Sequence, residues 1–198
     1  MKTYENELDE MIGAVIELTW NHTIFCTLFV EKDVELETRK CKARNAHPEF
    51  FLVIHNSLLC SFCVTTDLLF HKDKNGKATS LCNLIRDIEA SKPDVAKQLN
   101  EKIYAKKNLI EKVGTLRNEV CAHLWEAKTQ QEVFAEADVR LNMMKEIIDL
   151  AQIIICELAE EAGGNRRKNF EEQQLCKETL RCVARDANQV MRTFLDNC

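Results

Sequence analysis

Residues 49–71 read EFFLVIHNSLLCSFCVTTDLLFH and form the most hydrophobic stretch of the chain. Pro48 directly precedes this stretch, and proline suits the first turn of a helix. A helix of this length and composition is expected to be buried on most of its sides. Other helices, each with one apolar face, must then cover it.

On the N-terminal side, residues 4–20 carry apolar side chains at spacings of three and four, which predicts an amphipathic helix. The run 23–39 continues this pattern and ends in a strongly charged stretch. Residues 40–46 are rich in lysine and arginine and are interpreted as a basic connector that leads into the apolar segment.

On the C-terminal side, a turn at residues 72–77 precedes a short helix capped by Ser80. A long helix is predicted from Pro93 to Val120, with a kink at Gly114. Another helix starts at Asp138 and is stopped by two glycines at 163–164. Residues 180–194 form a separate amphipathic helix.

Together these segments predict an all-α, up-and-down bundle of long amphipathic helices. The break in pattern near residue 45 and the glycine pair near 165 suggest three parts. These are an N-terminal helical extension (1–44), a helical bundle (45–165) and a C-terminal amphipathic helix (166–198). Five glycines and two prolines are too few turn-formers for a many-stranded β protein.

Composition limits the classes of function. The net charge of −5 gives no overall attraction for nucleic acid, so any such function needs a local basic patch. The polar start and the absence of an apolar run of roughly 18 residues predict a cytoplasmic protein without a membrane span. Most of the ten cysteines are then expected to be reduced thiols in the core. The pair Cys60 and Cys63 has no second correctly spaced pair for zinc, and we expect neither a metal nor a cofactor.

Chemistry is suggested by one segment, residues 116–123, which reads LRNEVCAH. It places Arg117 six residues before His123, late in the long predicted helix. Six helical residues advance about 9 Å and leave the two side chains about 120° apart. Two such helices packed across a two-fold axis would bring an arginine and a histidine from different chains to one cleft.

Three lysines precede this segment, and a carboxylate lies inside it. Lys102, Lys106 and Lys107 form a basic strip that leads towards Arg117, as an RNA backbone would require. Glu119 lies four residues before His123 on the same side of a helix and is predicted to raise the pKa of the imidazole. The alternative interpretation of the three lysines is a solvated helix face.

The string Arg-Asn-x-x-x-Ala-His late in a long helix, followed by a polar stretch and another apolar helix, resembles the HEPN superfamily. More narrowly, it is similar to the abortive-infection branch of that superfamily, over roughly residues 45–165. The positions that match the motif are Arg117, Asn118 and His123.

This resemblance implies a helical bundle that dimerises through the motif helix, and a metal-independent endoribonuclease of toxin or phage-defence type. His123 would then transfer the proton, Arg117 would stabilise the scissile phosphate, and Asn118 would hold the phosphate or the imidazole. The products would carry cyclic phosphate and 5′-hydroxyl ends. Several toxin members have a tyrosine two residues after the histidine, whereas this chain has Trp125, which cannot accept a modification on a hydroxyl.

Two other readings stay open. One is a catalytically inactive HEPN-like module that binds RNA, a nucleotide or a partner protein, for example as one component of a toxin–antitoxin pair. An antitoxin of nucleotidyltransferase type is a partner that the resemblance also allows. The other is a purely structural helical dimer. The accessibility of Arg117 and His123 and their convergence on a common cleft distinguish the three readings.

Overall fold

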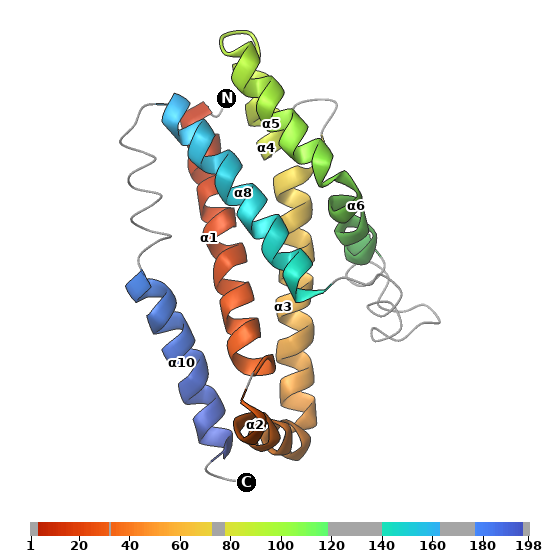
Figure 1. Ribbon diagram of the computed structural model, residues 1–198, viewed down its shortest axis with the longest axis vertical. Helices are drawn as coiled ribbons and strands as arrows, with labels where there is room; N and C mark the ends of the chain where they lie inside the picture. The colour runs from red at the N-terminus through yellow and green to blue at the C-terminus, as the bar shows by residue number, and fades with distance from the viewer. Residues whose placement is uncertain (1–3, 32, 73–77, 119–139, 163–176, 196–198) are drawn as a thin grey trace.

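The computed structural model describes residues 4–31, 33–72, 78–118, 140–162 and 177–195, and these residues form an all-α fold, as predicted (Figure 1). Long helices run up and down the molecule, and the two chain ends lie at opposite ends of the bundle. The helices are α1 (Tyr4–Phe29), α2 (Val34–Ala46), α3 (Pro48–Phe70), α4 (Leu81–Ile88), α5 (Pro93–Ala105), α6 (Lys107–Leu116), α8 (Leu141–Glu161) and α10 (Lys177–Leu195).

The apolar segment that opened the sequence analysis forms α3, with Pro48 in its first turn. It packs against α1 on one side and α6 on the other. Its burial is less complete than its composition suggests. Phe62 and Leu69 are buried, whereas Val53, Val64 and Leu68 are exposed. These three residues lie on one side of the helix, because their spacings of eleven and four residues are close to whole helical turns.

The main core joins α1, α3, α4, α5, α6 and α8. A second, smaller cluster lies where α10 meets α2 and the ends of α1 and α3. Its buried members are Leu28, Ala43, Phe51, Ala187 and Met191. The C-terminal helix α10 is therefore held along α1 and α2 by its own small apolar seam, apart from the main core.

The N-terminal region differs from the prediction at two points. The expected continuous pattern of residues 23–39 is interrupted, because α1 ends at Phe29 and α2 begins at Val34. Asp33 caps the new helix, with its carboxylate accepting a hydrogen bond from the backbone N–H of Leu36 at 2.8 Å. The predicted basic connector at 40–46 is wrong, since these residues are the last turns of α2.

The predicted helix from Pro93 is divided at Lys106 into α5 and α6, and not kinked at Gly114. The reason is a shift in the apolar stripe between Ile103 and Leu109, both of which are buried. Six residues turn the helix through about 600°, some 120° short of two full turns. A break lets α5 pack on α4 while α6 packs on α3.

The first 44 residues were expected to be an extension, and a three-part division of the chain stays a prediction. In the structure, α1 contributes Leu8, Val15 and Leu18 to the main core, and α2 belongs to the smaller cluster. Removal of residues 1–44 would therefore uncover α3 and α8, which α1 contacts along its length.

Two helices, α1 and α3, are long and apolar enough to cross a membrane by length and composition. This differs from the expectation that no segment would reach that limit. Both helices pack against each other and against further helices of the bundle. Core helices of water-soluble proteins pass the same test, so the feature does not assign the chain to a membrane.

Candidate functional site

Helix α6 carries the first two residues of the predicted motif. The helix ends at Leu116, and residues 117–118 continue it in a wider, π-type turn. Such turns are rare in proteins and are frequent at functional sites. Leu116 is buried, which anchors the end of the helix against the core, whereas Arg117 is half-buried and Asn118 is exposed. The turn therefore presents both predicted side chains at the surface.

Two side chains hold the guanidinium of Arg117. Its Nε lies 3.8 Å from Oδ2 of Asp67 on α3, and the side chains of this pair are 43% and 32% exposed. Its Nη1 donates a hydrogen bond of 2.9 Å to Oδ1 of Asn118. Within the described residues, no partner is found for the other terminal nitrogen. The guanidinium is thus oriented by its neighbours and still has a donor to offer to an anion.

Asp67 was not among the predicted site residues, although the sequence contained a signal. It is the one carboxylate between Phe50 and Phe70, within the most apolar segment of the chain. A charged residue in such a segment usually has a partner, because an unpaired charge is costly to desolvate. Asp67 also repels a phosphate, so its suitable role is to position Arg117 and not to contact the substrate.

The predicted RNA-binding lysines are each paired with a carboxylate. Lys102 forms an ion pair with Glu157 and Lys106 with Glu146, the latter at 2.7 Å, and both glutamates belong to α8. Lys107 lies 3.5 Å from Glu111, one turn further along α6. The break at Lys106 also removes the alignment with Arg117 that one continuous helix would have given. A role in binding RNA stays a prediction for these three residues.

A cavity of about 780 Å³ lies beside the bend between α5 and α6. Phe70 of α3 forms part of its wall, and Ile110 of α6 forms another. Ile110 lies seven residues, close to two full turns, before Arg117, so the two share a face of α6. The charged side chains of the lining have both signs, because Lys97 and Lys107 stand beside Glu101 and Glu111. The cavity therefore has no clear preference for an anion.

Gly114 lies between this cavity and Arg117 on the same face of α6. A Cβ added at Gly114 would meet none of the described residues within 4 Å. Glycine inside a helix costs about 1 kcal/mol relative to alanine, and packing against the described residues does not require it. As far as the described residues go, another molecule has room to approach α6 closely here, one turn before Arg117.

The remaining motif residues lie outside the described residues. This applies to His123, to Glu119 and to Trp125. The convergence of Arg117 with His123 and the expected effect of Glu119 on the imidazole pKa accordingly stay predictions. Among the described residues, no three His, Cys, Asp or Glu side chains gather as a metal site requires.

Two described histidines lie in other environments. His22 on α1 is half-buried, with its Nε2 3.6 Å from Sγ of Cys26. Burial lowers the pKa of His22, and the nearby ammonium of Lys145 lowers it further. The ring of His55 lies 5.2 Å from that of Phe25 and 5.1 Å from that of Phe29, centroid to centroid. Both histidines are explained by packing within the bundle.

Comparison with known proteins gives one match. The family model described as AbiU2, of the HEPN type, matches residues 4–179. No curated protein and no solved structure matches the chain. The match begins at the start of α1, so it includes α1 and α2, which were expected to lie outside the resemblance, and it ends within the first turn of α10. It also spans α6 with Arg117 and the whole of the predicted motif. By this match, the chain belongs to the AbiU2 family of HEPN proteins.

Proposed function

We propose that the protein is a metal-independent endoribonuclease of toxin or phage-defence type that acts in the cytoplasm as a homodimer. Family membership supports the coarser role, a nuclease or abortive-infection function. The finer proposal rests on one observation, the accessibility and orientation of the Arg117 guanidinium. This group is accessible, is oriented by Asp67 and Asn118, and is displayed on a π-type turn that leads into the rest of the motif.

In the proposed reaction, the ribose 2′-oxygen attacks the adjacent phosphorus while the bond from phosphorus to the 5′-oxygen breaks. His123 takes the proton of the 2′-hydroxyl or returns one to the leaving 5′-oxygen, a step worth ~10²–10⁴ in rate. Arg117 stabilises the charge that develops on the phosphate oxygens, worth about 10²–10³. Asn118, hydrogen-bonded to Arg117, holds the guanidinium or the phosphate in place. The products carry 2′,3′-cyclic phosphate and 5′-hydroxyl ends.

The proposed dimer follows from the expected angle between the two motif residues, since a continuous helix from 117 to 123 would direct them about 120° apart. Two surfaces near Arg117 are suited to a second copy of the chain. Val64 and Leu68 are exposed apolar residues on α3, and Leu68 directly follows Asp67. Gly114 gives α6 an open backbone one turn before the arginine. Apolar side chains and a small residue of this kind favour close helix contact.

The second candidate is an inactive module that binds RNA, a nucleotide or a partner protein such as a nucleotidyltransferase antitoxin. The pairing of Lys102, Lys106 and Lys107 with glutamates favours it, because paired ammonium groups attract RNA less strongly. A chain without a strong RNA surface of its own would depend on a partner for RNA contact.

Cleavage of 5′-labelled RNA in the presence of a chelator tests the proposal. Wild type should cut and leave cyclic phosphate ends, whereas Arg117→Ala and His123→Ala should lose at least about a hundredfold in rate. Lys112→Ala is the matched control, because Lys112 is an exposed cation on the same helix but on another face. Equal cleavage by all proteins, or cleavage that requires a metal, would contradict the mechanism and leave the binding module.

A mixing experiment tests the composite site. If each cleft takes arginine from one chain and histidine from the other, a heterodimer of Arg117→Ala with His123→Ala contains one intact cleft. Random exchange makes half of the dimers mixed, so about one quarter of wild-type activity should return. Mixed proteins that stay inactive, although exchange is demonstrated, would exclude a cleft shared in this way.

A further inference from the structure

A second cavity, of about 620 Å³, lies between α2 and α10, at the end of the bundle away from α5. This volume is within the range of pockets that bind small molecules. We call it the α2–α10 pocket. Its lining comes from the α1–α2 connection and from facing residues of the two helices, namely Glu31, Leu36, Arg39, Lys40, Asn188, Met191, Arg192 and Leu195.

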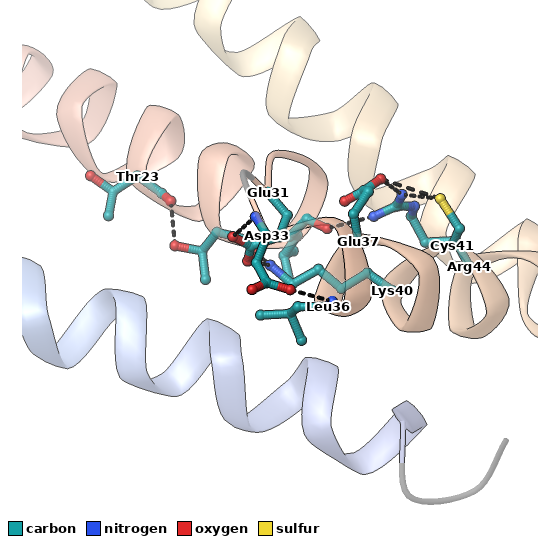
Figure 2. Close-up of polar contacts among 10 residues, drawn as sticks. Thr23, Glu31, Asp33, Leu36, Glu37, Lys40, Cys41 and Arg44 are labelled. Atoms are coloured by element: carbon teal, nitrogen blue, oxygen red, sulfur yellow. Dashed lines mark hydrogen bonds and ion pairs between the residues drawn. The ribbon is translucent and has the colours of Figure 1, made fainter.

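Two of the charged groups in the lining neutralise each other. The ammonium of Lys40 is almost fully buried and lies 3.0 Å from Oε2 of Glu31. It also donates a hydrogen bond of 2.9 Å to the carbonyl oxygen of Thr27. Figure 2 shows the Lys40 side chain extending towards the connection between α1 and α2, where Glu31 lies. Lys40 and Glu31 thus form a compensated pair and contribute no net charge to the pocket.

Among the described residues, the two arginines in the lining are not compensated in this way. Arg39 of α2 and Arg192 of α10 are exposed, and neither has an ion pair or side-chain hydrogen bond among the described residues. Arg44, also on α2, is different, because its guanidinium pairs with Glu37 at 2.5 Å and donates to the carbonyl oxygen of Leu28 at 3.2 Å. The helix therefore uses one arginine in the fold and leaves the other at the pocket.

The pocket also has apolar and neutral polar walls. Met191 is buried, and Leu36 and Leu195 are half-buried. Asn188 lies four residues before Arg192, on the same face of α10, and adds an amide donor. Two guanidinium groups with an amide donor match the oxygens of a phosphate, and the apolar side chains match an organic group attached to it.

We propose that the α2–α10 pocket binds a small phosphate monoester, with the phosphate between Arg39 and Arg192 and the organic part on Leu36, Met191 and Leu195. Two like charges in one lining repel each other, and a dianion removes this repulsion. A pocket of about 620 Å³ has room for a small molecule, whereas a polynucleotide needs a groove that runs across the surface. The proposal is independent of ribonuclease activity.

Binding at this place would also tie α10 to the rest of the fold. The helix is held by a small apolar cluster in which Ala187 and Met191 are its buried members. A phosphate that bridges α2 and α10 would add contacts between the same two helices. Hydrogen exchange in α10 should therefore slow when the ligand is bound, whereas exchange in α8 should not change.

The test is a titration of the full-length protein with phenyl phosphate, inorganic phosphate or phenol at constant ionic strength, followed by calorimetry and by the Tm. Phenyl phosphate should bind saturably and more tightly than inorganic phosphate, and phenol should not bind. Arg39→Gln and Arg192→Gln should each weaken binding by about tenfold or more. Arg181→Gln, an exposed arginine on α10 outside the pocket, should bind within about twofold of wild type.

Four outcomes would overturn the proposal. They are no saturable binding to wild type, equal binding by the Arg39 and Arg192 variants, equal affinity for phenyl phosphate and inorganic phosphate, or binding of a long RNA with none of phenyl phosphate. Because both arginines are exposed and outside the core, their substitution should leave the Tm of the free protein unchanged. That measurement separates loss of the site from loss of the fold.

Discussion

The two ends of the bundle differ in whether their positive charges already have partners. Near α5 and α6, Lys102, Lys106 and Lys107 stand out in the sequence, yet each is paired with a glutamate. Between α2 and α10, Arg39 and Arg192 are far apart in the sequence and line one pocket without a partner among the described residues. A count of basic residues therefore does not measure the charge available to a ligand.

The ion pairs at the two ends of the bundle also differ in how deeply they are buried. The ammonium of Lys40 is 4% exposed and its partner Glu31 is 21% exposed, whereas the side chains of Lys106 and Glu146 are 41% and 43% exposed. Ion pairs in water contribute little, because solvent screens them and ordering two long side chains costs entropy. A buried pair that loses one member leaves a charge without compensation.

The largest expected effect follows from this difference. Lys40→Met should lower the free energy of unfolding by about 2–3 kcal/mol, since Glu31 and the carbonyl of Thr27 lose their partner. The Tm should fall by roughly 5–10 °C. Lys106→Met should change stability by less than about 0.5 kcal/mol. Urea and thermal unfolding of both variants measure the contrast, and similar losses would show that burial is not what distinguishes the two pairs.

A double-mutant cycle on Glu31 and Lys40 sharpens this result. Adding Glu31→Gln to Lys40→Met should restore part of the loss, because the carboxylate that had lost the Lys40 ammonium is then uncharged. If the double variant is as unstable as the sum of the two single variants, the two groups do not act as a pair.

The next largest expected effect is on RNA affinity and concerns the lysines that pair with glutamates of α8. Glu146→Gln and Glu157→Gln release Lys106 and Lys102 from their ion pairs, so RNA binding should strengthen by about three- to tenfold at low salt. The plot of log affinity against log salt concentration should steepen by about one for each released lysine. Fluorescence anisotropy with the His123→Ala protein, which should bind without cutting, measures both quantities.

Glu49→Gln removes the same charge from an exposed position on α3 and serves as the control for net charge. An equal gain with this variant would mean that general repulsion from the acidic chain, and not release of particular lysines, limits RNA binding. No gain with any variant would place the RNA surface elsewhere.

The helices of the fold were largely predictable from the sequence, whereas the breaks between them were not. Periodicity identified the segments of α1, α3, α4, α8 and α10 and covered α5 and α6 with one helix, and Ser80 and Pro48 were placed correctly at helix starts. It did not identify α2 as a separate helix. It missed the break at Lys106 and the turn near Asp33. Both breaks depend on which neighbouring helix each apolar stripe packs against, which is a tertiary property. The six-residue gap from Ile103 to Leu109 in the apolar pattern is the one local sign of the first of them.

The candidate site shows a similar limit. The motif was predicted late in one long helix, whereas in the structure Arg117 and Asn118 follow the end of α6 and lie at the surface. Asp67 comes from another helix, fifty residues earlier, and the pairing of the lysines comes from α8. Contacts between helices that are distant in the sequence have no local signature. They decide which of several similar charged residues is oriented, and which is already engaged.

A smaller effect on stability is expected from substitutions at Gly114, which lies on the face of α6 beside Arg117. Gly114→Ala should stabilise the fold by about 0.5–1 kcal/mol, since alanine favours the helix and its Cβ meets no other atom. Gly13→Ala on α1, which also has open space at its Cβ, should stabilise by a similar amount. A larger side chain should then have different effects on function at the two positions. Gly114→Leu should weaken dimerisation or RNA cleavage, whereas Gly13→Leu should not.

Sedimentation and cleavage assays on the four glycine variants give the result. Loss of activity in Gly114→Leu with an unchanged Tm would support close approach of another molecule at this face of α6. If both leucine variants cleave and dimerise like wild type, Gly114 has no such role.

The smallest expected effect is on the pH dependence of stability and concerns His22, a half-buried histidine on α1 close to Lys145 of α8. Burial lowers the pKa of His22 from its ordinary value of 6.5, and the ammonium of Lys145 adds to the shift. A hydrogen bond with the backbone of Leu141 and the carboxylate of Asp149 act in the opposite direction. Lys145 is itself paired with Asp149 at 2.7 Å, which reduces its influence on the imidazole.

Because the folded protein keeps His22 neutral, the unfolded chain takes up the proton first as the pH falls below 6.5. Stability should therefore decrease as the pH is lowered from 7.5 to 5.5, and more steeply in wild type than in His22→Gln. His71→Gln, at an exposed position after α3, should keep the wild-type slope. Urea unfolding at the two pH values measures the difference. A slope unchanged by His22→Gln would mean that Asp149 and the Leu141 backbone offset burial and Lys145 in full.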